Sequence, residues 1–215
     1  MFCHLKLNTK AKTKARGAAD RAETILRRME DLCISGERVE VCPNTVSYNI
    51  AINAHARSNE EGSAKRAEHL LRRMDDLSTS YECKDMFSDC KPDIISYSGV
   101  INAWSRSKKY YAAERAESIL LHMERQYSTG LSVIEPNIVT YTSAINAWAN
   151  SKQQDSAERA EALLNRMDSH YREGNEALKP TVLTYNTGKH VQNKTRQHRF
   201  FGNFEFFPID TVFFS

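Results

Sequence analysis

The chain has 215 residues, of which 40% are hydrophobic and 27% are charged, and its formal net charge is +3. The chain contains only 8 Gly and 5 Pro, which favours a helical protein with polar outer faces. No apolar run approaches the roughly 18 residues that a membrane-spanning helix needs, so we expect no membrane span.

The positive charge is concentrated at the ends of the chain. Residues 1–19 contain five basic residues and no acid, and the body over residues 20–187 is net acidic. Any contact with nucleic acid must therefore depend on where individual charges lie. We interpret residues 1–18 as a basic segment or a degenerate first helix. An acid-free basic start also fits the remnant of an organelle transit peptide.

Two motifs alternate along the body of the chain. The first begins at a proline and reads PNTVSYNIAINAHARS from Pro43, and its tyrosines are spaced by 49, 44 and 44 residues. The second contains Arg-Ala-Glu followed by apolar residues and a methionine. Repetition at both motifs predicts an array of similar structural units. The tyrosines are Tyr48, Tyr97, Tyr141 and Tyr185, and the Arg-Ala-Glu cores occupy 21–23, 66–68, 115–117 and 159–161.

Each unit has the pattern of a helix pair. Ala67, Leu70, Leu71 and Met74 form one apolar stripe at helical spacing, and the proline before each first helix suits a helix start. A single hairpin cannot bury such a stripe, so we predict an all-α fold, an α-solenoid of stacked antiparallel helix-turn-helix repeats. First helices are expected at 45–57, 94–106 and 138–150, and second helices at 63–77, 112–126 and 156–170.

The expected boundaries follow from the two motifs. The array spans residues 19–187, and the tail over residues 188–215 contains 7 of the 9 phenylalanines. We expect this Phe-rich tail to be poorly ordered and assign it no role. The units are a partial one at 19–44, complete ones at 45–93, 94–137 and 138–181, and the start of another at 182–187.

Cysteine spacing predicts no zinc site, because six residues separate the nearest pair, Cys83 and Cys90. We expect all five cysteines to be thiols. The sequence also contains no Walker loop, no His-Glu-x-x-His and no nucleophile elbow. We therefore expect no enzyme activity, no metal, no cofactor and no small-molecule substrate.

Taken together, the motifs resemble the pentatricopeptide repeat family. The resemblance covers roughly residues 19–187 and depends on the hydroxyl-Tyr pair, the Ala-Glu second helix and the Pro-Asp or Pro-Asn step. These units are longer than the family's repeats of about 35 residues. The excess lies mainly at 78–91, 126–135 and 170–179.

The resemblance implies a site that reads one RNA base per repeat. Two side chains would contact each base: the residue after the tyrosine and the residue after the next proline. A β-branched apolar residue two before the tyrosine would sandwich the base. When the family's reading positions are transferred to this sequence, the base-reading pairs are Asn49 with Asp93, Ser98 with Asn137, and Thr142 with Thr181. The residues that would sandwich the base are Val46, Ile95 and Val139. The family's preferences imply uracil, then adenine, then a weakly specified base.

Charge on the first helices agrees with such a site. Residues 45–59, 94–109 and 137–154 contain no Asp or Glu, so this surface can approach a phosphate backbone. The candidates for phosphate contact are Arg57, Arg106, Lys108, Lys109 and Lys152.

Simpler interpretations exist for several of these residues. The residue after each proline could be a helix N-cap only. The tyrosines, Trp104 and Trp148 suit core positions. The Arg-Ala-Glu segments suit solvated helix charge with i,i+4 pairing. Inter-repeat hydrogen bonds are the expected role of Asn53, Asn102 and Asn146.

Two functions therefore remain. The first is sequence-selective binding of single-stranded RNA in organelle RNA processing, stability or translation. By family analogy the location is a mitochondrion or plastid, with other RNA-processing proteins as further partners. The alternative is a protein-protein interaction scaffold whose concave face binds a peptide, for which that face should be apolar.

Overall fold

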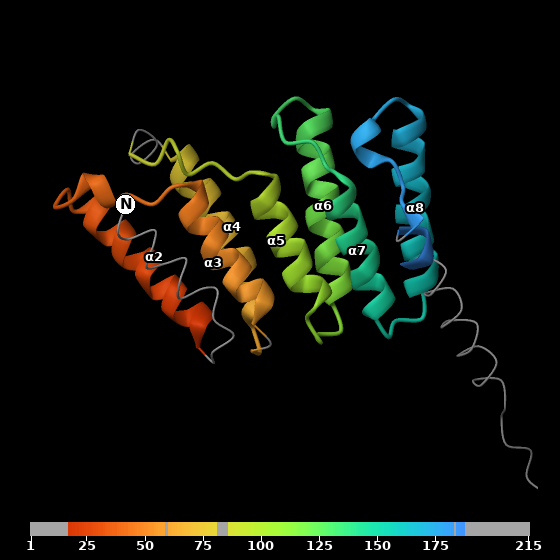
Figure 1. Cartoon of the computed structure of the whole chain (residues 1–215), viewed down its shortest axis with the longest axis horizontal. Helices are drawn as coiled ribbons and strands as arrows, with labels where there is room; N and C mark the ends of the chain where they lie inside the picture. The colour runs from red at the N-terminus through yellow and green to blue at the C-terminus, as the bar shows by residue number, and fades with distance from the viewer. Residues whose placement is uncertain (1–16, 59, 81–85, 183, 188–215) are drawn as a thin grey trace, which may run out of the picture.

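The computed structural model describes residues 17–187 except 59, 81–85 and 183. These residues form helices joined by turns and loops, and no strand occurs among them (Figure 1). The expectations for the basic N-terminal segment and for the Phe-rich tail concern residues almost wholly outside this part. No helix in the described part has the length and apolar character to cross a bilayer.

The predicted all-α architecture is confirmed. All six expected helices begin at the expected residue, and each ends within two residues of the expected end. Second helices run two residues further than predicted. In chain order the helices are α2 (Ala18–Ile34), α3 (Thr45–Arg57), α4 (Ser63–Thr79), α5 (Ile94–Ser105), α6 (Ala112–Ser128), α7 (Ile138–Asn150) and α8 (Ser156–Arg172), with short 3₁₀ turns η1 (Val39–Val41) and η2 (Glu176–Leu178).

First helices begin where a polar side chain caps them. Asn44, Asp93 and Asn137 each accept a backbone N–H three residues ahead, and a Ser or Thr at that third position returns a contact to the cap residue. This reciprocal arrangement satisfies backbone donors that a helix start leaves open. The cap therefore explains why each first helix starts directly after its Pro-Asn or Pro-Asp step.

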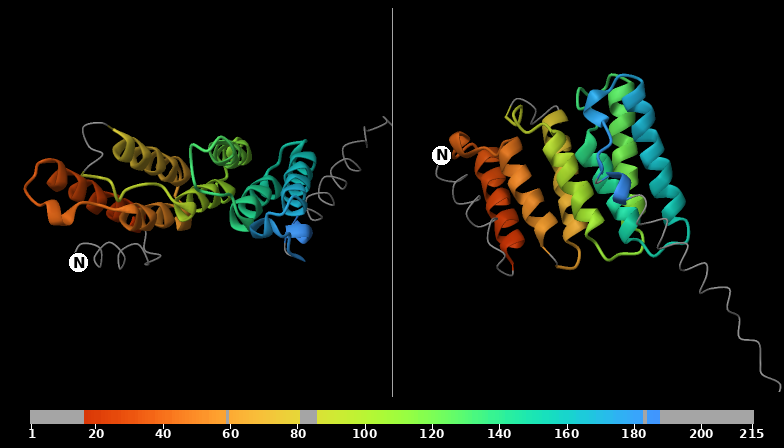
Figure 2. Two further views of the ribbon diagram at one scale, coloured as in Figure 1. Left: turned by 90° about the horizontal axis from the view of Figure 1, so that it is seen from above. Right: turned by 45° about the vertical axis from the view of Figure 1, so that its right-hand side comes forward.

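The helices form two layers. Along the inner layer α3 packs on α5 and α5 packs on α7, while α4, α6 and α8 pack mainly against the first helices beside them (Figure 2). Gly99 allows the close approach of α5 to α3, because a Cβ there would lie 2.8 Å from Ile52 Cγ2. Because the inner helices touch and the outer ones are spaced apart, the first helices line the inside of the curve.

Apolar stripes of both layers meet in a continuous core. Ala67, Leu70, Leu71 and Met74 are all buried, as the sequence predicts. Tyr48, Tyr141, Trp104 and Trp148 are buried too, which confirms their core role, whereas Tyr97 is half-buried. Tyr185 departs from the expectation, because 43% of its surface is exposed near the end of the described array.

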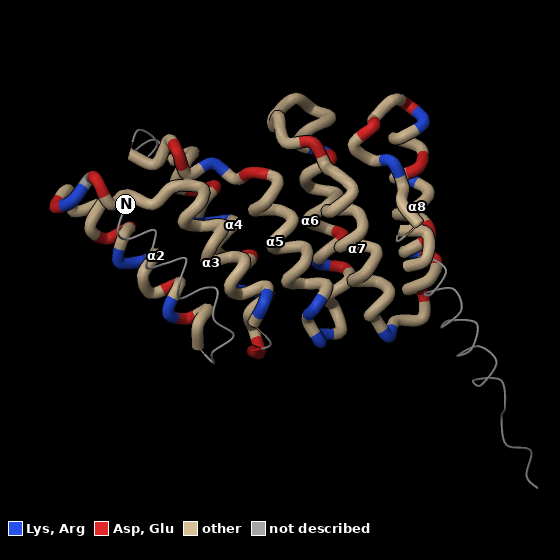
Figure 3. The backbone as a smooth tube through the Cα atoms, viewed as in Figure 1, with Lys and Arg blue, Asp and Glu red and all other residues tan. Residues whose placement is uncertain are grey.

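Charged residues are segregated between the layers. Helices α3, α5 and α7 contain no Asp or Glu, so the acidic residues belong to the second helices and the loops (Figure 3). The inner layer therefore presents no carboxylate from within its helices.

The interpretation of the Arg-Ala-Glu segments as solvated charge is wrong for three of the four glutamates, and it holds for Glu161, which is exposed. Glu23, Glu68 and Glu117 are each only 7% exposed. Each accepts a hydrogen bond from the next first helix: from the His55 ring, 2.9 Å, from Trp104 Nε1, 2.8 Å, and from Trp148 Nε1, 2.9 Å. The i,i+4 pairs Arg27–Glu23 and Arg72–Glu68 are also present. One repeated carboxylate therefore joins each unit to the next.

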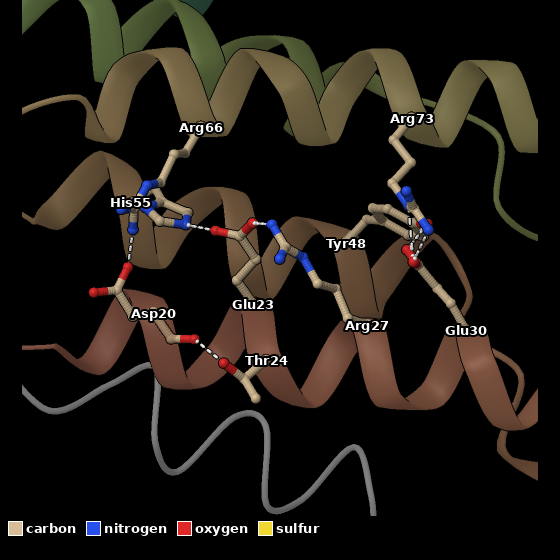
Figure 4. Close-up of polar contacts among 9 residues, drawn as sticks. All are labelled: Asp20, Glu23, Thr24, Arg27, Glu30, Tyr48, His55, Arg66 and Arg73. Carbon is tan, nitrogen blue, oxygen red and sulfur yellow. Dashed lines mark hydrogen bonds and ion pairs between the residues drawn. The ribbon is translucent and has the colours of Figure 1, made fainter.

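A second set of carboxylates lies seven residues further along the second helices. Glu30 accepts from the Tyr48 hydroxyl and from Arg73 of the following second helix, where Nε lies 2.8 Å from Glu30 Oε2 (Figure 4). Glu124 likewise contacts the Tyr141 hydroxyl and Arg166. Burial and the neighbouring carboxylate both raise the pKa of each tyrosine well above its usual range.

The expectation that all five cysteines are thiols is wrong for one pair. Cys33 at the end of α2 and Cys42 before α3 form a disulfide bond around η1. Cys90 is a buried thiol whose Sγ donates to the Pro43 carbonyl oxygen over 2.8 Å. Burial, with help from Glu30 and Asp89, raises the pKa of the Cys90 thiol to about 12.

Candidate nucleic-acid interface

An apolar side chain is exposed at the same place in each unit. Val46, Ile95 and Val139 lie in the first turns of α3, α5 and α7, and their exposed fractions are 57%, 53% and 52%. The tyrosine two residues later points into the core in α3 and α7. Exposed β-branched residues that recur with the repeat form a row on which flat apolar groups can lie.

Beside Val46 the first base-reading pair is in direct contact. Asn49 Nδ2 donates to Asp93 Oδ1 over 3.0 Å, although 44 residues separate the two side chains. Asn49 Oδ1 accepts from the Ser96 hydroxyl over 2.6 Å. Asn49 is 7% exposed, so little of its surface is accessible. The loop before α5 thus brings the end of one unit against the start of its own first helix.

Asp93 has both of the roles considered for it. Its Oδ1 caps α5 by accepting from Ser96 N over 2.8 Å, and the same oxygen accepts from Asn49. Within the described residues Oδ2 makes no hydrogen bond. Capping explains the position of Asp93, and it leaves the contact with Asn49 unexplained.

The second pair is arranged differently. Ser98 Oγ donates to the Ile94 carbonyl oxygen in its own helix over 2.5 Å, and it makes no hydrogen bond with Asn137. Asn137 Oδ1 accepts from Val139 N and Thr140 N over 3.0 and 3.2 Å, as a cap does. The Asn137 Nδ2 group has no partner among the described residues, so it remains able to donate.

The third pair is not joined either. Thr142 is half-buried at the surface of α7. Thr181 lies within 3.0 Å of the Thr184 hydroxyl, in the same capping arrangement seen at the other first helices. Of the three pairs, only Asn49 and Asp93 are joined by a hydrogen bond.

The candidate phosphate-binding residues lie at the opposite end of the first helices. Arg57, Arg106, Lys108 and Lys152 are exposed in or near the turns that follow α3, α5 and α7. Lys109 instead forms an ion pair with Glu61 of the preceding turn. A pocket of about 440 Å³ opens between the turns after α3 and α5, and its lining includes both Arg106 and Glu60. This end is basic in α5 but is not free of acid.

Between the two ends runs a row of amides. Asn53, Asn102 and Asn146 are half-buried, one on each first helix. The expected inter-repeat hydrogen bonds are absent: Asn53 and Asn146 make no side-chain hydrogen bond to another described residue, and Asn102 only accepts from Ser105 over 3.5 Å. The surface between the helix ends is therefore polar.

One residue of this site was missed by the sequence analysis. Ser96 is fully buried and touches both members of the first pair. Its signal in the sequence is the Ser or Thr that precedes every repeat tyrosine, at Ser47, Ser96, Thr140 and Thr184.

Part of the chain matches a known protein family. Residues 131–187, which include α7 and α8, match the family model described as the pentatricopeptide repeat domain. The family resemblance is thereby confirmed over that segment. No curated protein matches the chain.

Proposed function

We propose that this chain, which contains a pentatricopeptide repeat domain over residues 131–187, binds single-stranded RNA with one base per unit at the starts of α3, α5 and α7. The observation that carries the proposal is the row of exposed Val46, Ile95 and Val139, one in the first turn of each first helix. Apolar side chains offer a base a flat contact, and polar groups beside them can test its edge.

Free hydrogen-bonding groups at the first pair fit uracil. Asn49 retains one N–H beyond the bond to Asp93, and Asp93 retains Oδ2 as an acceptor. Uracil presents a carbonyl acceptor beside the N3–H donor, which complements such a donor and acceptor. Because cytosine has an amino group and an unprotonated N3 at those places, it should bind less well.

The second pair supports an adenine preference. The Ser98 hydroxyl donates its hydrogen to the Ile94 carbonyl oxygen, so towards a ligand it can act only as an acceptor. Asn137 Nδ2 can donate. Adenine offers an amino donor beside the N1 acceptor. The third pair, Thr142 with Thr181, makes no comparable arrangement, and we propose that it specifies its base weakly.

Phosphate contacts would come from the other end of the same face. Arg57 follows Val46 by eleven residues, which puts the two on one side of α3 and about 16 Å apart. Arg106 follows Ile95 by the same interval. The residue of α7 that corresponds to Arg57 and Arg106 is Asn150, whose Nδ2 donates to the Ser105 carbonyl oxygen over 3.3 Å. The candidate for phosphate contact in that unit is therefore Lys152.

We further propose a role in organelle RNA processing, stability or translation, in a mitochondrion or plastid, together with other RNA-processing proteins. The family match motivates this role. The half-buried amides along the inner layer argue against the alternative of a peptide-binding scaffold, which would need an apolar concave face.

Competition binding with short single-stranded RNAs tests the proposal. In Asn137→Asp the donor becomes an acceptor, so the second base should shift from adenine towards guanine, which presents an N1–H donor. The expected change in relative affinity is about 1–3 kcal/mol at fixed salt. Capping of α7 should be retained, since Asp and Asn cap equally well.

Selection of bound RNA from a random pool provides the independent control. A chain that enriches no sequence and binds no RNA at low salt would refute the proposal. Binding with an unchanged adenine-to-guanine ratio in Asn137→Asp would show that Asn137 is a cap only.

A further inference from the structure

The Ser96 side chain lies at the centre of the first base-reading pair. It is fully buried at the start of α5, and its Oγ lies 2.6 Å from Asn49 Oδ1, 2.9 Å from Asp93 Oδ1 and 3.7 Å from Met74 Sδ. Ser96 Oγ also accepts from Asp93 N over 3.1 Å. Its single hydrogen has three possible acceptors, and the choice among them affects the site.

The shortest contact identifies the acceptor of that hydrogen. Asp93 Oδ1 already accepts from Ser96 N and from Asn49 Nδ2. Asn49 Oδ1 has no other donor among the described residues. The Ser96 hydroxyl therefore satisfies an otherwise unpaired buried oxygen by donating to Asn49, which is the arrangement expected of a buried amide.

This bond fixes which way the Asn49 amide points. If the amide were turned by 180°, Asn49 Oδ1 would face Asp93 Oδ1, placing two acceptors together, and Nδ2 would face the Ser96 oxygen. With the amide held as observed, Asn49 directs Nδ2 towards Asp93, and the remaining N–H is the group left for a ligand.

The equivalent hydroxyl in the next unit, Thr140 Oγ1, has different hydrogen-bond partners. Thr140 Oγ1 donates to the Asn137 carbonyl oxygen over 2.7 Å and accepts from Asn137 N over 3.0 Å. It makes no hydrogen bond with Ser98. The two hydroxyls share the capping role, and only Ser96 also reaches the residue that follows the repeat tyrosine.

We propose that Ser96 is a positioning residue for base discrimination at the first unit, where it holds the Asn49 amide in the orientation that presents a donor to the base. The proposal rests on the RNA-binding function proposed above. It makes the first unit the most selective of the three, because its reading groups are held by hydrogen bonds before RNA arrives.

The test compares Ser96→Ala with Thr140→Ala, which removes the same capping hydroxyl from the next unit. The readout is the ratio of affinities for RNAs with uracil or cytosine at the first position. Ser96→Ala should lower this ratio about fivefold, the equivalent of one lost hydrogen bond. Thr140→Ala should leave the ratio unchanged, and Ser96→Thr, which keeps the hydroxyl, should retain most of it.

A second measurement needs no RNA. In ¹H–¹⁵N spectra, one Asn49 side-chain hydrogen of the unaltered protein should exchange slowly with solvent because Asp93 and Ser96 hold the amide. Fast exchange of both hydrogens would overturn the proposal even if Ser96→Ala does not fold. An unchanged uracil-to-cytosine ratio in a folded Ser96→Ala would overturn it too. Failure of the unaltered chain to bind any RNA, with slow exchange intact, would instead refute the proposed function.

Discussion

The junction from α2 to α4 and the junction from α4 to α6 use the same three positions with different side chains. In the first, Glu30, Tyr48 and Arg73 form a buried bridge across the three helices. In the second, the aligned residues are Asp75, Tyr97 and His122. There the Tyr97 hydroxyl makes no hydrogen bond to a described residue, and both Asp75 and His122 are exposed. The junction from α6 to α8 restores the bridge with Glu124, Tyr141 and Arg166.

This difference shows how much the bridge depends on side-chain length. Aspartate is one methylene shorter than glutamate, and a histidine ring cannot extend as an arginine does. The backbone of α5 nonetheless packs between its neighbours as α3 and α7 do. The stack therefore does not need this particular bridge at every junction, although Glu68 still links α4 to Trp104 and Arg115 at this one.

The largest effect is expected from removing an intact bridge. Glu30 has no exposed surface, so Glu30→Ala leaves the Tyr48 hydroxyl and the Arg73 guanidinium without their shared partner. We expect the free energy of unfolding to fall by about 3 kcal/mol. Asp75→Ala is the matched control and should change it by less than about 0.5 kcal/mol. Urea denaturation measures both, and equal losses would contradict the comparison.

A smaller effect in the opposite direction should follow from building the missing bridge. Asp75→Glu combined with His122→Arg supplies the side chains found at the other two junctions. We expect a gain of about 1 kcal/mol in the free energy of unfolding, mostly absent from either single variant. A double-mutant cycle by urea denaturation measures the coupling. Additive single effects would show that this junction differs in backbone spacing and not only in side chains.

The smallest effect concerns pH. A hydrogen bond from His55 lowers the pKa of Glu23 below its usual 4.5. Burial opposes this shift, and the charges of His55 and Arg27 add to it. Because the folded-state pKa is the lower one, the contribution of Glu23 is present above the unfolded-state pKa and is lost as the pH falls through the folded-state value.

Glu23→Gln should therefore destabilise the protein at pH 7, and its stability should converge with that of the unaltered chain as the pH falls through the folded-state pKa of Glu23. Urea denaturation from pH 7 to pH 3 gives the difference between the two proteins. A difference that stays constant over this range would mean that the charge of Glu23 contributes nothing.

Most of the fold could be predicted from the sequence because the signals are local and repeated. Proline followed by a capping residue marks each first helix, and stripes such as Ala67 to Met74 mark the buried face of each second helix. The family pattern also paired Asn49 with Asp93, although it did not predict that their side chains form a hydrogen bond.

Other features depend on distances that no local pattern contains. A glutamate at the Arg-Ala-Glu position looks the same in sequence whether it pairs with Arg72 four residues on or with Trp104 in the next unit, and Glu68 does both. The hydroxyls of Ser96 and Thr140 choose different acceptors within a few ångströms. Cys33 and Cys42 are close because of the loop between them, and their spacing of nine residues does not reveal it.

The contrast between the layers has a mechanical consequence. Inner helices touch through apolar surfaces and a glycine, so their spacing is set by hard contact. Outer helices are linked across their gaps by long side chains, such as Arg115 to Glu68 and Arg159 to Glu117. Bending the array changes the length of these ion pairs far more than it changes the inner contacts. The outer ion pairs therefore resist bending, and the inner layer acts as the pivot. Because Glu68 and Glu117 are buried, added salt should weaken these links less than it weakens fully exposed ion pairs.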